Sequence, residues 1–225
     1  MMSSQRGFTL IELMVVITVI LIIMVMAIPT LLSARVSANE AAAIQTLRTI
    51  STAQAQFSRS AVADEDRDAT GEFGMLGELA GSASVRGGTS RTPTDLSAAM
   101  GLVTVNGEVE KSGYVFRIYL PDGAGLGVQE SSGGGVPAGV LGADLAEGYW
   151  CCYAWPARRG STGRRTFFID ATSDIVSTDA PDYSGVNCPA IKAGSAYQSS
   201  NVDSMTGSLA VGTIGADGNL WRMAN

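Results

Sequence analysis

The sequence predicts an α+β protein in which a long N-terminal α-helix packs against a C-terminal antiparallel β-sheet head with Gly-rich loops. Residues 8–32 are almost continuously apolar, residues 33–60 continue with apolar side chains at helical spacing, and the remainder of the 225-residue chain holds short strand-like runs. A helix followed by a series of strands is typical of α+β folds. We expect a polar leader over residues 1–7, the helix over 8–62 and the head over 63–225.

The first half of the predicted helix has the length and composition of a membrane span. Between residues 8 and 32 the one ionisable side chain is Glu12. At about 1.5 Å per residue this stretch reaches roughly 37 Å, which exceeds the bilayer core of about 30 Å. A carboxylate inside a membrane costs on the order of 2.5–3.5 kcal/mol. Glu12 therefore marks a functional position and implies a partner for its charge.

Two simpler interpretations of the same segment compete with a functional one. A secretory signal peptide has an apolar stretch of about 7–15 residues followed by its cleavage site. Here the apolar run is longer, and the junction between Gly7 and Phe8 precedes it. A plain single-pass anchor explains the hydrophobicity but leaves both Glu12 and the Gly7–Phe8 junction without an explanation.

The second half of the predicted helix is amphipathic. Its apolar residues recur every three or four positions, which is the pattern of a helix with one buried face. We expect this helix to continue to about Ser60, for a total of about 75 Å, with the head packed on the apolar stripe. The predicted apolar stripe consists of Ala41, Ile44, Leu47, Ile50, Ala53 and Phe57. The predicted solvent-facing side consists of Arg35, Asn39, Glu40, Gln45 and Arg48.

The head shows strand signals separated by polar and Gly-rich segments. Asn106-Gly107 favours a type I′ turn joining strands at residues 102–105 and 108–110. Residues 73–81 predict a short helical turn, and residues 121–148 are expected to be mostly loop. The other predicted strands are residues 114–120 and 149–155, a hairpin of 165–170 with 174–177, and two weaker strands at 207–214 and 219–222.

The residues Arg6-Gly7-Phe8-Thr9-Leu10-Ile11-Glu12-Leu13-Met14 resemble the N-terminus of the type IV pilin family, which includes the pseudopilins of type II secretion systems. The head matches that family in general organisation only. The resemblance implies that residues 1–7 are a prepilin leader peptide. It also implies that a membrane peptidase cuts between Gly7 and Phe8 and then methylates Phe8.

The resemblance implies that Glu12 registers incoming subunits. The amine freed at Phe8 would be positive, and Glu12 of a neighbouring subunit could neutralise it, because pairing two charges cancels much of the cost of each in lipid. Glu12 could instead pair with the amine of its own chain, about one turn away. Pro29 lacks a backbone N–H and predicts a kink or local melting over residues 25–29.

Composition narrows the chemistry available to the head. The chain has no His, the commonest general base and transition-metal ligand, and its net charge of −6 gives nucleic-acid binding no support. An exported head lies in a compartment where disulfides persist. We therefore expect Cys188 to bridge either Cys151 or Cys152. The alternative is three reduced cysteines in the core.

Two clusters of charged residues are candidate sites. A basic cluster is formed by Arg158, Arg159, Arg164 and Arg165. The cluster could bind an anionic partner such as DNA or surface polysaccharide, or it could be a solvated hairpin. The carboxylates within residues 64–68 lack EF-hand spacing and are interpreted as a solvated turn.

Further acidic, aromatic and glycine-rich segments lack the spacing of a known site. Asp203 and Asp217 could supply oxygen ligands to Ca²⁺, as in some pseudopilins, but their spacing matches no defined loop, and we expect no metal and no cofactor. Trp150, Tyr153 and Trp155 are expected in the core or a subunit interface. The glycine-containing stretches have neither Walker nor Rossmann form.

The sequence therefore predicts a non-enzymatic structural subunit, the major pilin of a type IV pilus. Its partners would be further copies in a helical filament, the prepilin peptidase, the inner-membrane assembly machinery and an outer-membrane secretin, with no small-molecule substrate. The precursor would lie in the inner membrane and the pilus outside the cell. The alternatives are a type II secretion pseudopilin or minor pilin and, in another class, a membrane-anchored binding protein or enzyme.

Overall fold

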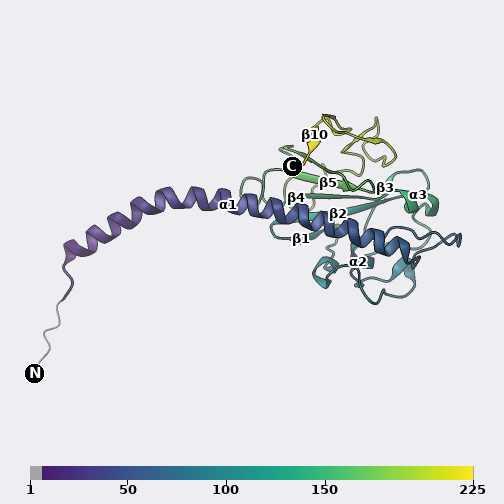
Figure 1. Ribbon diagram of the computed structural model, residues 1–225, viewed down its shortest axis with the longest axis horizontal. Helices are drawn as coiled ribbons and strands as arrows, with labels where there is room; N and C mark the ends of the chain where they lie inside the picture. The colour runs from purple at the N-terminus through teal and green to yellow at the C-terminus, as the bar shows by residue number, and fades with distance from the viewer. Residues whose placement is uncertain (1–6, 225) are drawn as a thin grey trace, which may run out of the picture.

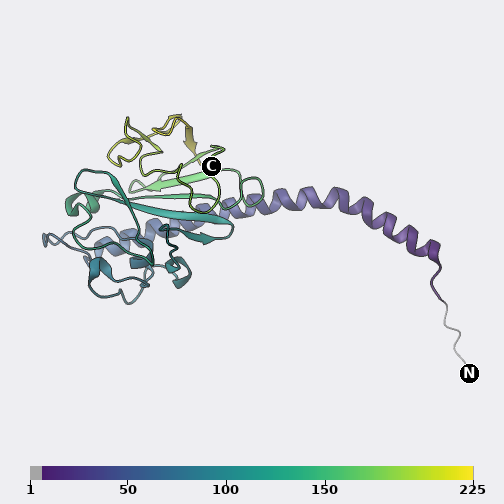
Figure 2. The ribbon, with the colours of Figure 1, turned by 180° about the vertical axis from the view of Figure 1, so that it is seen from behind.

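The computed structural model describes residues 7–224 and consists of one long helix and a β-sheet head (Figure 1). Helix α1 (Leu10–Arg59) is continuous over 50 residues. The first half of α1 extends away from the head, and its second half lies along one face of the sheet (Figure 1). In the reverse view the sheet lies in front of the helix (Figure 2). The predicted α+β fold is confirmed.

The head is built around an eight-stranded sheet whose pairings are all antiparallel. Its strand order is β1–β2–β4–β5–β6–β10–β9, with β3 also paired to β2, and β7 and β8 form a separate ribbon. The strands are β1 (Val109–Lys111), β2 (Tyr114–Pro121), β3 (Gly127–Gln129), β4 (Cys151–Pro156), β5 (Thr166–Asp170), β6 (Ile175–Thr178), β7 (Tyr197–Gln198), β8 (Ser208–Leu209), β9 (Thr213–Ile214) and β10 (Leu220–Met223). The short helices are α2 (Leu76–Leu79), α3 (Ala143–Gly148) and the 3₁₀ turns η1 (Val85–Gly87) and η2 (Ala98–Gly101).

Both ends of α1 have local causes. At the start, the Thr9 hydroxyl accepts from the Glu12 N–H at 3.2 Å while the Glu12 carboxylate accepts from the Thr9 N–H at 3.0 Å, a capping box. At the end, the Ser60 hydroxyl donates to a helix carbonyl, and Ala61 turns into the left-handed region with φ 44°. The observed helix is therefore shorter at each end than the predicted 8–62.

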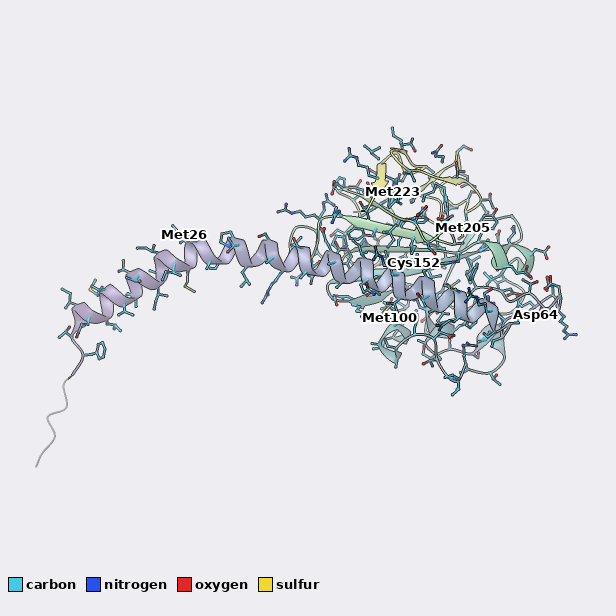
Figure 3. All side chains as sticks on the ribbon, in the orientation of Figure 1. Met26, Asp64, Met100, Cys152, Met205 and Met223 are labelled. Atoms are coloured by element: carbon cyan, nitrogen blue, oxygen red, sulfur yellow. The ribbon has the colours of Figure 1, made fainter. Side chains whose placement is uncertain are left out.

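Helix α1 stays helical through Pro29. Pro29 cannot donate to the carbonyl four residues earlier. The Thr30 hydroxyl donates to the Ala27 carbonyl at 2.8 Å and so adds a bond in the same turn. The helix curves over its first half (Figure 1), and Met26 lies on the curved part (Figure 3). Residues 25–29 are helical, so the predicted local melting is not observed, and the kink at Pro29 stays a prediction.

The buried stripe of α1 differs in detail from the predicted one. Ala41 is exposed, Ala43 is buried in its place, and Glu40, assigned to the wet side, is also buried. Alanine is too small for its hydrophobicity to fix a helix face. Seven of the nine buried positions alternate in spacing between three and four residues, and Thr46 and Ala53 widen the stripe. The seven are Val36, Glu40, Ala43, Leu47, Ile50, Gln54 and Phe57.

Both faces of the sheet are covered. Because successive side chains of a strand point to opposite faces, Phe116 and Ile118 of β2 pack in the cluster containing α1, while Val115 and Tyr119 pack in a second cluster. The second cluster is closed by residues 180–210, the C-terminal segment that lies apart from α1 in Figure 1. The head therefore has three layers: α1, the sheet and the C-terminal segment.

The aromatic residues of β4 belong to the core. Tyr153 donates its hydroxyl to the Ala193 carbonyl at 2.9 Å, and the Trp155 indole N–H donates to the Gly185 carbonyl at 2.7 Å. These bonds tie the polar tips of buried rings to the backbone of the C-terminal layer. Of the two predicted environments for these rings, the core is the observed one.

The central strands were predicted correctly, but one hairpin turn was misplaced and one predicted strand is divided into two. The expected turn at Asn106-Gly107 joins no pair of strands, because residues 102–105 are not a strand. The hairpin turn between β1 and β2 is instead Ser112-Gly113, where both residues have positive φ (51° and 74°), as a type I′ turn requires. Residues 207–214 form two short strands, β8 and β9, in place of one.

A buried ion pair lies between the sheet and the C-terminal layer. The Arg117 guanidinium on β2 contacts the Glu108 carboxylate, with side chains 5% and 1% exposed. Glu108 also accepts from the Asn187 N–H at 2.8 Å, and Arg117 donates to the Tyr119 hydroxyl at 2.9 Å. Glu108 therefore joins β2 to the C-terminal segment.

We expect Glu108→Ala to destabilise the head by about 3–5 kcal/mol, because it leaves the Arg117 charge buried without its partner. Glu110→Ala is the matched control: Glu110 is exposed on the neighbouring strand position, so its loss should change stability by about 0.5 kcal/mol or less. Urea unfolding of the full chain in detergent, followed by tryptophan fluorescence, measures both. Equal losses in the two variants would contradict this assignment.

Candidate functional site

The candidate site is the N-terminal motif and the apolar helix that follows it. All residues from 7 to 35 are exposed, including Phe8 at 84% and Leu10 at 76%. Helix α1 is long and apolar enough to cross a membrane, and none of its apolar segment is buried by the head. The fold thus leaves this half of α1 available to lipid or to another protein.

Glu12 is the polar centre of this surface. One oxygen, Oε2, accepts from both the Thr9 N–H at 3.0 Å and the Thr9 hydroxyl at 2.8 Å. The carboxylate therefore lies at the positive end of the helix dipole. Among the described residues, no donor bonds to the other oxygen, Oε1. Glu12 thus has capacity for a further donor.

The Gly7–Phe8 junction lies next to this carboxylate. Thr9, the residue bonded to Glu12, directly follows Phe8 in the chain. Phe8 lies four positions before Glu12 in the chain, and both residues line the same shallow hollow at the start of α1, so pairing within the chain is geometrically open. The exposure of both residues leaves pairing with a neighbouring subunit equally open. Residues 1–6 of the predicted leader, including Arg6, lie outside the described residues.

Two family models match the chain. The first, the prokaryotic N-terminal methylation motif, matches residues 2–28 and is the prepilin signature of type IV pilins and pseudopilins. The second is described as a protein of unknown function (DUF2950) and matches residues 26–193, more than half of the chain.

The chain belongs to the DUF2950 family. It carries the prepilin signature at its N-terminus, which confirms the resemblance read from residues 6–14. No curated protein and no solved structure matches the chain.

The methylation motif supports a type IV pilin-like or pseudopilin protein, and it points to a structural role. It implies processing by prepilin peptidase and assembly in a type IV or secretion system. Together with the apolar helix it fits a precursor anchored in the inner membrane.

The predicted arginine cluster is divided by the fold. Arg165 donates to Glu40 on α1 at 2.8 Å, and the Glu40 carboxylate also accepts the backbone N–H groups of Arg164 and Arg165. Arg159 donates to the carbonyls of Asp179, Ala180 and Arg164. Two of the four arginines therefore hold the turn between β4 and β5 in place. Arg158 and Arg164 have exposed side chains, and anion binding there stays a prediction.

The predicted disulfide is not formed. Within residues 7–224 all three cysteines are unbridged and buried, which corresponds to the alternative of reduced core cysteines. Adjacent residues of β4 point to opposite faces, so Cys152 packs toward α1 while Cys151 and Cys188 pack toward the C-terminal layer. Burial raises the pKa of the Cys151 thiol well above its usual range. These thiols are therefore core residues here.

The acidic turn of residues 64–70 is stabilised by hydrogen bonds within the turn. Asp64, Asp66 and Asp68 accept bonds from backbone N–H groups within residues 68–70. Their oxygens lie within 4.8 Å of one another. Partial desolvation and the nearby carboxylates of Asp68 and Asp144 raise the pKa of Asp66, although an N–H bond lowers it. The fold thus joins this turn to α3, which the sequence did not indicate.

The C-terminal acids have a structural explanation. Asp217 accepts from the Tyr183 hydroxyl, from the Asn219 N–H at 2.9 Å and from the Trp221 indole N–H at 3.3 Å. These bonds fix the turn between β9 and β10. Asp203 lies in another loop, where its carbonyl accepts from the Gly127 N–H. Asp203 and Asp217 therefore lie in different loops.

Glu130 is a buried ionisable residue that sequence analysis missed. It is 2% exposed, and its Oε1 accepts the N–H groups of Gly77 and Gly135 at 2.7 Å each. Among the described residues no hydrogen-bond donor reaches Oε2. Burial raises the pKa of Glu130 to about 7, with a smaller contribution from Glu78, although the two N–H bonds lower it. A single Glu in a loop gives no sequence signal of such burial.

We expect the stability of the head to fall as the pH rises from about 4.5 to about 7. In that window the unfolded Glu130 ionises while the folded one keeps its proton, so the unfolded state gains stability. The change is on the order of 3 kcal/mol. Glu130→Gln should remove this part of the pH dependence. Thermal unfolding of both proteins between pH 4 and pH 8 measures the difference, and parallel curves would refute the assignment.

Proposed function

We propose that this chain is the polymerising subunit of a type IV pilus. It is made as an inner-membrane precursor, cut after Gly7, methylated at Phe8 and assembled through α1 into a filament that carries the β-sheet heads outside. The observation that carries the proposal is the exposed half of α1, where residues 7–35 make no buried contact with the head and hold one acid near their start.

The physical basis is an exchange of environments. In the membrane the apolar residues of α1 contact lipid, and in a filament they contact the helices of other subunits by close packing. Glu12 and the freed Phe8 amine are each costly in lipid when alone. A pair formed between two subunits lowers that cost only when the subunits are in register. Glu12 thus favours docked subunits over isolated ones.

A type II secretion pseudopilin or a minor pilin is the second candidate, because it would share the N-terminal motif and the exposed helix. Abundance and location separate it from a major pilin. A membrane-anchored binding protein or enzyme is the candidate of another class, and it would need no polymer.

Intact-mass analysis and N-terminal sequencing of protein sheared from cells test the proposal directly. We expect an abundant chain that begins at Phe8 and carries one added methyl group. The same processed chain confined to the cell envelope would favour the pseudopilin or minor pilin. A chain that still begins at Met1 would contradict the processing step and favour a simple anchor.

We expect Glu12→Ala and Glu12→Gln to abolish filaments while the protein stays processed and membrane-bound, because both remove the charge that pairs with the Phe8 amine. Electron microscopy of sheared material and immunoblotting of membranes measure the two outcomes.

Thr18→Ala is the matched control for these variants. Thr18 is also a polar residue on the exposed half of α1, but its hydroxyl donates to the Met14 carbonyl of its own helix. Filaments of this variant should match those of the wild type. Normal filaments in the Glu12 variants would exclude Glu12 as the registering group.

A further inference from the structure

We propose that the acidic end of one head docks on the basic end of another head in the filament, so that charge complementarity sets the contact between heads. The partner is a second copy of this chain. The inference rests on the proposed filament, but it concerns surfaces of the head, away from the N-terminal motif.

The acidic end lies where α1 finishes, opposite the N-terminus, as the position of Asp64 in Figure 3 shows. We call it the distal pole and define its acids by residues of the turn after α1 and of α3: Asp64, Glu65, Asp66, Asp68, Asp144 and Glu147. Two exposed arginines, Arg59 at the end of α1 and Arg67 in the turn, lie among them, so the carboxylates outnumber the bases. Asp66 and Asp144 are exposed at its surface.

The carboxylates of the distal pole are close enough to disfavour one another. Partial desolvation together with Asp68, Asp66 and Asp144 raises the pKa of Glu147. The Glu147 Oε1 is shielded from solvent, and no described residue donates a hydrogen bond to it. An approaching cation would relieve the repulsion at the exposed carboxylates Asp66, Asp68 and Asp144.

The basic end lies where α1 enters the head. We call it the proximal pole and define it by Arg35 on α1 and by the arginines of the turn between β4 and β5: Arg158, Arg159, Arg164 and Arg165. The acids that line its cleft are Glu40, which pairs with Arg165, and Asp179. The five arginines outnumber these two acids.

The proximal pole also has a concave surface. A cleft of about 280 Å³ between α1 and the turn is lined by Ser33, Val36, Ser37, Glu40, Arg164, Arg165 and Asp179. Arg165 is held there by Glu40, and Arg159 by backbone carbonyls, so the charges are positioned before a partner arrives. A carboxylate from a neighbouring head could approach the exposed Arg164 at this cleft.

Parallel packing of subunits brings these two poles together. If the N-terminal halves of α1 all point toward the base of a filament, the heads share one orientation. A head stacked above another then presents its proximal pole to the distal pole of the head below. Such a head-to-tail contact joins two different surfaces and builds an open helical polymer.

Charge reversal tests this contact in the full chain expressed in its own host. Asp66→Lys with Asp144→Lys reverses exposed distal acids, and Arg158→Glu with Arg164→Glu reverses exposed proximal bases. Like charges facing each other cost several kcal/mol, so each pair should lower the amount of sedimented filament by about tenfold or more. Combining the four substitutions should restore filaments to within about twofold of the wild type.

Matched controls reverse charges outside both poles. Asp174→Lys lies in the turn between β5 and β6, and Lys192→Glu lies in the C-terminal layer, both exposed. Filaments should be unchanged in these two variants. Unfolding curves check that each variant folds. If a pole variant fails to fold, wild-type filaments moved from about 0.05 M to about 1 M salt provide the test, because the Debye length falls from more than 10 Å to about 3 Å.

The outcomes separate the two proposals. Loss in each pole variant with recovery in the combined variant, or dissociation of filaments at high salt, supports the docking of poles. Wild-type levels in the pole variants, loss without recovery, or filaments indifferent to salt would overturn it and leave the filament itself standing. Absence of any polymer from the wild type, with Phe8 processing intact, would overturn both.

Discussion

The structure depends on a division of α1 between two environments. From Val36 onward the helix carries a stripe that the sheet must cover, and before Val36 it carries apolar residues that nothing in the head covers. The Glu40 carboxylate lies at this boundary and fixes the turn between β4 and β5 to the helix. The point at which α1 leaves the head is therefore set by a polar contact at the edge of the apolar core.

The same division gives the molecule its polarity. One end of the head adjoins the exposed apolar half of α1 and carries Arg158 and Arg164, while the other end carries the acidic turn and α3. The exposed charges Arg158, Arg164 and Asp66 lie in turns between core elements, where substitutions disturb the sheet least. An interaction built on these poles would be specific to subunits that share the same helix-to-head geometry.

The head is closed by its C-terminal layer as much as by its helix. Hydroxyl and indole groups of Tyr119, Tyr153 and Trp155 bond to carbonyls of that layer, and the Glu108–Arg117 pair lies beneath it. With both faces covered, the central strands β2, β4, β5 and β6 are buried at every position. The three buried cysteines remain thiols, and the core is packed without a disulfide between them.

The sequence by itself determined the long helix, the prepilin signature with Gly7, Phe8 and Glu12, and the central strands, because these follow from local spacing and composition. The tertiary structure alone decided that Glu40 is buried, that Arg159 and Arg165 serve the fold, and which residues form each pole. Each of these depends on contacts between residues tens of positions apart, such as Glu40 with Arg165 or Glu130 with Gly77. The free energy of a charged side chain depends on its burial and on its partners. Because those partners are distant in the chain, the local sequence pattern does not predict them.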